Sequence, residues 1–300
     1  AAELAVDEVG AHRRPHRAGD HEALRDGDQT VEVQAALRDR NFFLRRRAAA
    51  YRAWYEHMPV PPSMAPNGPD MRIHDSWRFG DLVDLFLLDD RQYRSHHACA
   101  GGKGGRALFT DCAERLDPRR TMLGVEQETW LRDGLSRARG RWTVIAQQTL
   151  MAEADRAAAS TAEHAYWMDG WDGYPAGRQR LLDAMAVRRD ANHVVLGGDI
   201  HMYAVADIRS GNGPVIASEF VGTSITSVGP SAERVRTLAA RNPHLKYLRG
   251  DKRGYVVVDI TPASCQAHFE IVDDVADRKT GKRRLASFAV AAGRPGAVPA

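Results

Sequence analysis

Asp199 and His201 place a carboxylate and an imidazole two residues apart, after the apolar run 194–196 and two glycines. In extended backbone, positions i and i+2 point to the same side of the chain, so both side chains would face one metal ion. Carboxylate oxygen suits hard cations, and imidazole nitrogen suits iron, zinc or manganese. The spacing alone leaves an alternative open, in which Asp199 belongs to a glycine turn and His201 is an unrelated surface residue.

Further clusters of acidic, imidazole and aromatic residues lie near the ends of predicted strands, where the active sites of α/β proteins lie. They are Asp-His-Glu at 20–22, the segment 89–94, the Trp- and Tyr-rich segment 166–174, and Glu219 after another apolar run. Two-metal phosphoesterases use these residue types, because the ions activate a water molecule and a His or Asp protonates the leaving alkoxide. Each cluster taken singly also has a structural interpretation, such as a turn cap or a packed loop.

Helical and strand periodicities alternate along the chain, which favours an α/β fold with a mixed sheet or a pair of sheets. Helices are expected at 32–57, 125–138, 174–188 and 231–241, strands at 82–88, 142–146, 193–197, 202–208 and 214–220, and a hairpin at 255–260 and 265–272. Residues 152–165 are either a loop or a short helix. We expect an irregular segment at 1–30, one domain at 31–276 and a loose basic tail at 277–300.

The bulk composition excludes several classes of protein. The 300 residues carry 42 basic and 39 acidic side chains, a net charge of +3, which is too balanced for nucleic-acid-specific binding. No apolar run approaches the roughly 20 residues of a transmembrane helix, and the first 30 residues lack the apolar region of a signal peptide. Cys99 and Cys112 flank a glycine-rich loop and are either bridged or two free thiols.

Five motifs taken in order resemble the PhoD-type alkaline phosphatases of the metallophosphoesterase superfamily. They are Asp-Asp-Arg-Gln-Tyr-Arg at 89–94, Gly124 with Gln127 and Trp130-Leu131, Trp-Asp-Gly-Tyr-Pro at 171–175, Gly-Asp-Ile-His at 198–201 and the segment 219–227. The resemblance covers about residues 42–272. It implies an αββα sandwich that hydrolyses phosphate mono- or diesters with iron and calcium, other divalent metals being an alternative.

The matched motifs assign roles to individual residues. By resemblance, Asp199, His201 and Glu219 are metal ligands, and 20–22 matches the end of the family's Trp-Asp-Asp-His-Glu motif. Asp20 would then bind metal and His21 would lie near the leaving oxygen. Weaker candidates for phosphate contact are Arg91, Tyr174 and His244.

The sequence also departs from the family pattern. Ala18-Gly19 stands where the family has Trp-Asp, and Arg25-Asp26 stands near its paired asparagines. The iron-binding Asp, Cys and Tyr segments are expected upstream of residue 1, so we expect a sandwich that is incomplete at its N-terminus. The alternative to an active hydrolase is therefore a catalytically impaired fragment that lacks upstream metal ligands.

The resemblance also implies where the protein acts and on what. The family is exported, usually by a twin-arginine signal, so a secreted, periplasmic or extracellular location is expected, with which a Cys99–Cys112 bridge would be consistent. The expected partner is a small phosphate ester. The oligomeric state is left open.

Overall fold

The computed structural model describes residues 39–99, 108–188, 192–211 and 213–300. The described residues fall into two compact units, 39–73 and 74–300. The predicted irregular segment at 1–30 lies outside the described residues.

The unit 39–73 is built around helix α2 (Arg40–His57) and the short 3-10 helix η1 (Pro62–Met64). The Asp39 carboxylate caps α2 by accepting the backbone N–H groups of Asn41 and Phe42 at 2.8 and 3.2 Å. The helix ends at His57, two residues before Pro59, because the residue that precedes a proline disfavours helical backbone. The predicted helix therefore exists over its described part, and residues 32–38 of the prediction lie outside it.

A seven-stranded mixed sheet organises residues 74–300, in the order β1-β2-β4-β6-β8-β7-β9. Strands β2, β4, β6 and β8 are parallel, so their carboxyl ends meet at one edge of the sheet. The strands span Asp75–Phe79 (β1), Val83–Leu87 (β2), Trp142–Ala146 (β4), Asn192–Gly197 (β6), Tyr203–Arg209 (β7), Val215–Val221 (β8) and Leu245–Arg249 (β9).

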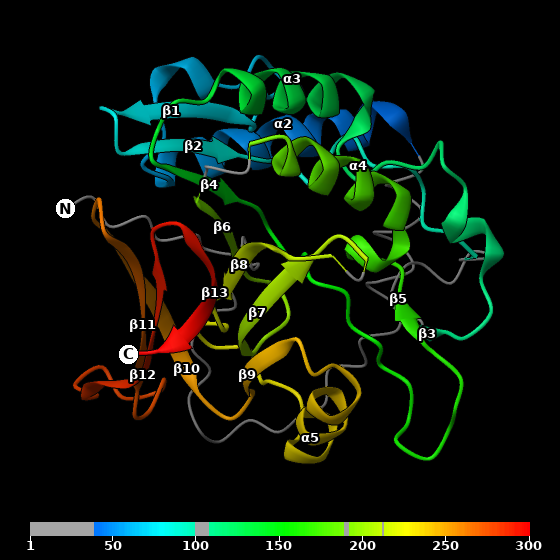
Figure 1. Ribbon diagram of the computed structural model, residues 1–300. Coiled ribbons are helices and arrows are strands. Elements are labelled where there is room, and N and C mark those ends of the chain that lie inside the picture. The colour runs from blue at the N-terminus through cyan, green and yellow to red at the C-terminus, as the bar shows by residue number, and fades with distance from the viewer. Residues whose placement is uncertain (1–38, 100–107, 189–191, 212) are drawn as a thin grey trace. The chain divides into compact units, whose positions relative to one another are not determined.

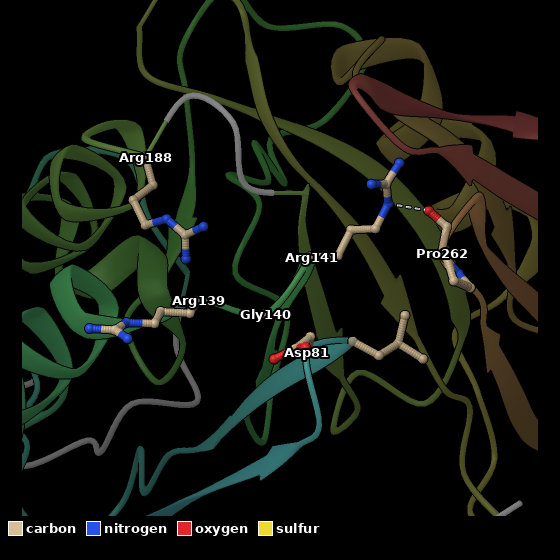
Figure 2. Close-up of a pocket in the computed structure, with 7 residues that line it drawn as sticks. Asp81, Arg139, Gly140, Arg141, Arg188 and Pro262 are labelled. Atoms are coloured by element: carbon tan, nitrogen blue, oxygen red, sulfur yellow. Dashed lines mark hydrogen bonds between the residues drawn. The ribbon is translucent and has the colours of Figure 1, made fainter.

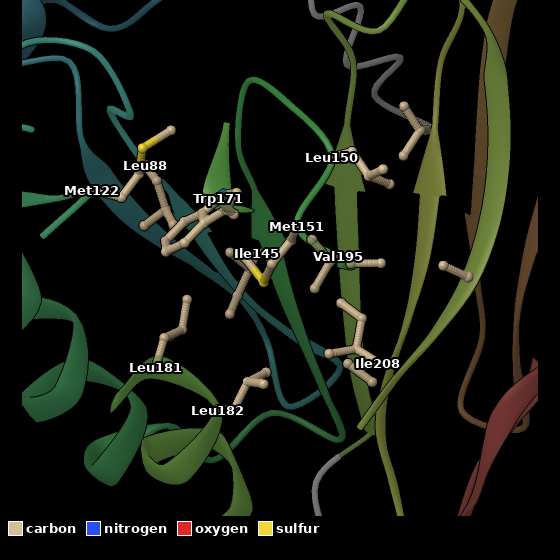
Figure 3. Packing of buried hydrophobic residues seen from close by; sticks show 14 of the residues in the cluster. Leu88, Met122, Ile145, Leu150, Met151, Trp171, Leu181, Leu182, Val195 and Ile208 are labelled. Carbon is tan, nitrogen blue, oxygen red and sulfur yellow. The ribbon is translucent and has the colours of Figure 1, made fainter. Parts of the chain in front are cut away.

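Helices cover one face of this sheet. They are α3 (Gly124–Arg137), α4 (Pro175–Ala186) and α5 (Ala232–Arg241). Figure 3 shows how Leu181 and Leu182 of α4 meet Ile145 of β4 and Val195 of β6, with Trp171 beside them. The short elements η2 (Ala113–Leu116), η3 (Trp171–Gly173), β3 (Leu108–Phe109) and β5 (Tyr166–Trp167) connect the helices, and β3 pairs with β5.

A four-stranded antiparallel sheet packs on the other face of the large sheet (Figure 1). Its strands are β10 (Arg253–Ile260), β11 (Ser264–Val272), β12 (Lys282–Ala291) and β13 (Arg294–Pro299). Phe269 of β11 meets Tyr203 of β7 edge to face, with 5.2 Å between ring centroids. The predicted α/β sandwich of helices and two sheets is thus confirmed. Within the described part of 74–300, no helix covers the outer face of the small sheet.

The predicted loose tail at 277–300 is wrong, because most of it forms β12 and β13. Phe288 and Val290 point inward from β12 and are buried against the large sheet, at 6% and 2% exposure. The alternation of these residues with small and basic ones is the period-2 pattern of a half-buried strand, which the Ala-, Gly- and Pro-rich composition obscured. The prediction also missed β9 and the short strands β3 and β5. The predicted helices α3, α4 and α5 and the predicted strands β2, β4, β6, β7, β8, β10 and β11 begin and end within two residues of their expected bounds.

Two valines of β12 and β13 provide a matched test of whether this C-terminal segment is part of the core. Val290→Ala should lower the free energy of unfolding by about 1.5–3 kcal/mol, since it removes two methyl groups from a closed core. Val298→Ala, at a residue 57% exposed on β13, should change it by less than about 0.5 kcal/mol. Urea denaturation measures both, and equal effects would mean that the tail adds nothing to the core.

Candidate functional site

Four loops meet at the carboxyl edge of the large sheet, following β2, β4, β6 and β8. The first two are joined side by side, because Gln148 accepts the N–H of Asp90 at 2.7 Å and donates its own N–H to the Asp90 carboxylate at 3.2 Å. Gln127 of α3 anchors the loop after β2 through both backbone groups of Asp89, at 2.8 and 2.9 Å. These bonds bring the predicted segment 89–94 to the same edge as Asp199 and His201.

The loop after β6 is a sharp turn rather than extended chain. Asp199 has φ +68° and His201 has φ +56°, and the N–H of Ile200 donates to the carbonyl of Gly198 at 2.8 Å. This two-residue span is a γ-turn centred on Asp199. Left-handed backbone at residues other than glycine costs about 1–3 kcal/mol each and clusters at functional sites. The premise that Asp199 and His201 continue the strand in extended backbone is therefore wrong.

The turn is forced by packing on both sides. A Cβ at Gly197 would lie 2.2 Å from the carbonyl oxygen of Thr149, so only glycine allows β6 to pass the loop after β4. Ile200 and Met202 return at once to the core beneath the helices, at 8% and 3% exposure. The chain between these anchors has room only for a tight reversal, which turns Asp199 toward the loop after β2.

Arg91 and Asp199 are brought together as a salt bridge. Arg91 Nη2 donates to Asp199 Oδ2 at 3.0 Å, and Arg91 Nη1 donates to Asp169 Oδ2 at 3.1 Å. The Asp89 carboxylate accepts the N–H of Arg91 at 2.9 Å and fixes its backbone. Burial opposes the charge of Arg91, but the two carboxylates outweigh it and raise the pKa of the guanidinium.

His201 is tied to the loop after β8. Its Nδ1 lies 3.2 Å from the Val228 carbonyl, and its own carbonyl accepts a hydrogen bond from Arg253 Nη1 at 3.1 Å. Arg253 Nη1 also donates to the hydroxyls of Thr223 and Ser224 at 2.9 and 2.7 Å. Arg253 thus links two loops of the candidate site. No role was predicted for this arginine, since it lies 52 residues from His201 in the chain and no spacing links the two.

Glu219 lies inside β8, opposite Val195, and is fully buried. Its two carboxylate oxygens accept the N–H groups of Met151 and Ala152 at 2.7 and 2.8 Å, so it holds the loop after β4. Burial raises the pKa of Glu219 to about 7. The predicted role of Glu219 as a metal ligand stays a prediction beside this structural contact.

Tyr174 and His244 lie farther from the turn. The Tyr174 ring is fully buried, and its hydroxyl donates to the Ser95 carbonyl at 2.6 Å. His244 precedes β9, and its Nε2 lies 2.8 Å from the Glu153 carbonyl. Among the described residues, no hydrogen bond or ion pair joins either side chain to Asp199, so their predicted contact with phosphate stays a prediction.

The aromatic segment 166–174 contains β5 and η3, and a disulfide lies beside it. Trp171 Nε1 donates to Gln147 at 3.2 Å. Cys99 and Cys112 form a disulfide with a Cα–Cα distance of 5.9 Å, which decides between the two alternatives left by the sequence. Cys112 and the fully buried Met168 share a small apolar cluster, so the bridge supports this loop.

A cavity of about 600 Å³ lies away from these loops, where β2 and β4 begin (Figure 2). Its walls are Asp81, Leu82, Arg139, Gly140, Arg141, Arg188 and Pro262. None of the predicted site residues lines it, and Arg141 is engaged with the Pro262 carbonyl. The chemistry of this cavity does not match the acid–imidazole clusters of the candidate site.

Comparison with known proteins identifies the family. The model of the PhoD-like phosphatase family matches residues 16–269. The chain belongs to the PhoD-like phosphatase family. Alkaline phosphatase D of Bacillus subtilis (strain 168) is 38% identical over 253 residues, which are 82% of this chain and 42% of that protein. A solved structure described as "Structure of PhoD" matches with a TM-score of 0.78 at 35% identity, over 86% of this chain and 49% of that one.

The chain spans less than half the length of these two relatives. The predicted family and the predicted fold class are confirmed. The match begins at residue 16, before the range 42–272, and includes Asp20 and His21 of the motif matched at 20–22. Both residues lie outside the described part of the chain.

The described residues offer one isolated carboxylate oxygen that could accept a metal, but no set of ligands. Asp90 is fully buried, and its Oδ1 has no hydrogen-bond partner there, which is rare for a buried carboxylate oxygen. Burial raises the pKa of Asp90 to about 7. Nevertheless, no group of three or more His, Cys, Asp or Glu side chains within the described ranges is arranged to hold a metal ion. The described residues alone therefore do not form the metal site.

The left-handed backbone of the turn predicts that glycine is more stable than alanine at position 201, the reverse of the usual order. His201→Gly should be more stable than His201→Ala by about 1 kcal/mol, because glycine has no Cβ to clash in left-handed backbone. The matched control is His244, whose backbone has no positive φ and where alanine should be at least as stable as glycine. Thermal or urea unfolding of the four variants measures this, and the same order at both histidines would contradict the strained turn.

Asp172 of the aromatic loop predicts a pH dependence of stability. It is buried against Arg178, and burial raises its pKa to about 6, so the folded protein holds this proton more tightly than the unfolded chain. The free energy of unfolding should therefore fall as pH rises from about 4 to 6, by roughly 2–3 kcal/mol relative to Asp172→Asn. Urea titrations across pH 4–7 compare the two proteins, and parallel profiles would show that Asp172 ionises normally.

Proposed function

We propose that this chain hydrolyses phosphate mono- or diesters at the carboxyl edge of its large sheet. The supporting observation is the strained turn that carries Asp199 and His201 and that bonds Asp199 to Arg91 at 3.0 Å. Strain of this kind persists where the surrounding structure over-determines it, and it is common at active sites. Membership of the PhoD-like phosphatase family supports the same chemistry.

Arg91 supplies the contact to phosphate in this proposal. A guanidinium presents five N–H donors in a planar fork that matches the oxygens of a phosphoryl group. The Arg91 side chain is 36% exposed, so it is held by Asp169 and Asp199 yet remains reachable from solvent. His21 protonates the leaving alkoxide, which is the part of the reaction that an imidazole performs near neutral pH.

Metal dependence belongs to the same proposal. The ligands would be Asp20, Asp199, His201 and Glu219, with iron and calcium as the ions. Family membership supports the metals, and the convergence of loops at one edge supports Asp199 and His201. Because the described residues do not complete a metal site, metal content is a measurement to make alongside activity.

The proposed substrate is a small phosphate ester. The proposed place of the reaction is outside the cytoplasm. No helix in the described residues is both long and apolar enough to cross a bilayer. The Cys99–Cys112 disulfide supports an oxidising compartment, since such bridges persist in secreted and periplasmic proteins. This bridge and the family membership support our proposal of a secreted, periplasmic or extracellular enzyme.

The activity test uses p-nitrophenyl phosphate and bis-p-nitrophenyl phosphate at alkaline pH, with and without iron, calcium and a chelator. Asp199→Asn and His201→Asn should each lower turnover by more than about 100-fold, while leaving the fold intact because asparagine tolerates left-handed backbone. Asp133→Ala on the exposed side of α3 is the control and should keep full activity.

Full activity in both site variants would contradict the assignment of this edge. Turnover that the chelator removes would support the metal, and the ratio of the two rates would rank monoesters against diesters. A folded, disulfide-bonded sample with no turnover would instead favour the catalytically impaired alternative.

A further inference from the structure

One carboxylate gathers three basic side chains beside the turn. Asp169 Oδ2 accepts from Arg91 Nη1 at 3.1 Å, and its Oδ1 lies 2.8 Å from Arg94 Nη1 and 2.9 Å from His97 Nε2. Arg94 Nη1 also donates to the Asp169 carbonyl at 2.9 Å. Asp169 is 20% exposed and Arg94 19%, so the cluster is partly buried but open to a ligand.

The backbone of Asp169 is held rigidly. Its neighbour Met168 is fully buried in the apolar cluster that includes Cys112 of the disulfide. On the other side, Gly173 packs so closely that a Cβ there would lie 2.4 Å from the Met168 carbonyl oxygen. The carboxylate is therefore a fixed point against which the two long arginine side chains are oriented.

The contacts with Asp169 leave donors for a ligand. In the described part of the chain, Arg94 uses only Nη1, so its Nη2 and Nε are not engaged. Two guanidinium groups share the Asp169 carboxylate, and Arg91 also pairs with Asp199, so two arginines stand against two carboxylates. Arg91 and Arg94 hold the pKa of Asp169 below its usual range although burial opposes them, so the carboxylate stays charged at neutral pH.

We propose that Asp169 is a positioning residue, which orients the guanidinium groups of Arg91 and Arg94 to receive the phosphoryl group of the ester. This inference rests on the proposed function. A free arginine loses about 2 kcal/mol of rotamer entropy when a ligand immobilises it, and Asp169 removes part of that loss before the ligand arrives.

A charge effect of opposite sign competes with this role. Removing the Asp169 carboxylate makes the cluster more positive and would tighten the binding of an anion if charge dominated. The cluster is partly exposed, however, and solvent and salt screen such interactions. Orientation of two flexible side chains should therefore outweigh the change in charge.

The experiment measures Asp169→Asn in two ways on the full chain. Steady-state hydrolysis of p-nitrophenyl phosphate should show KM raised about tenfold with kcat changed less than about threefold. Calorimetric titration with inorganic phosphate should show Kd raised by a similar factor, without depending on turnover. Asp117→Asn removes a carboxylate that pairs with the exposed Arg119 and takes no part in the Asp169 cluster. It is the control and should leave both values unchanged.

A second set of variants separates positioning from a general loss of structure. In the background Arg91→Ala with Arg94→Ala, Asp169→Asn should change the phosphate Kd less than twofold, because its partners are gone. If Asp169→Asn does not fold, Arg94→Lys replaces it, since a lysine keeps the charge but loses the fork and should also raise Kd.

An unchanged or lower KM and Kd in Asp169→Asn would overturn the inference, as would an equal effect in the arginine-free background. A wild-type protein that binds phosphate without turnover would refute the proposed function while the calorimetry still decides the role of Asp169. Normal hydrolysis with no effect of Asp169→Asn would refute this inference alone.

Discussion

The close approach of β6 to the loop after β4 is the constraint on which the candidate site depends. Gly197 lies so close to the Thr149 carbonyl that no side chain fits between them, so β6 ends in direct contact with the backbone of that loop. The chain must then reverse, and the reversal puts Asp199 and His201 into left-handed backbone. A bulkier residue at 197 would push β6 away from the loop after β4 and so displace the turn that follows it. The Asp199–Arg91 bond and the bond from Arg253 to the His201 carbonyl would shift with the turn.

Buried carboxylates hold the loops that surround the turn. Glu219 fixes the loop after β4 through two backbone N–H groups, and Asp90 joins the loops after β2 and β4 through Gln148. Their burial disfavours the charged form, which raises the pKa of each to about 7. Such groups weaken the fold where they ionise. Their presence beneath four converging loops is understandable if the edge must be polar and rigid rather than maximally stable.

Periodicity and composition predicted most of the fold, because buried parallel strands are continuous apolar runs and the helices carry clear amphipathic spacing. The tail was missed because β12 and β13 contain Ala, Gly and Pro, whose strand character comes from pairing with β11 rather than from propensity. At the site, the types of Asp199 and His201 were visible, but their backbone geometry was not. It depends on the Thr149 carbonyl, 48 positions before Gly197 in a different loop.

The contrast between Arg91 and Arg253 shows what sequence can and cannot assign at such a site. Arg91 follows a strand directly and lies among acids, so its type and place already pointed to the edge. Arg253 begins β10 of the small sheet and reaches back to the carbonyl of His201 and to two hydroxyls after β8. Only the packing of the second sheet on the first brings it there. The small sheet therefore contributes a side chain to the edge in addition to half of a core, and the geometry of the turn depends on both sheets being in place.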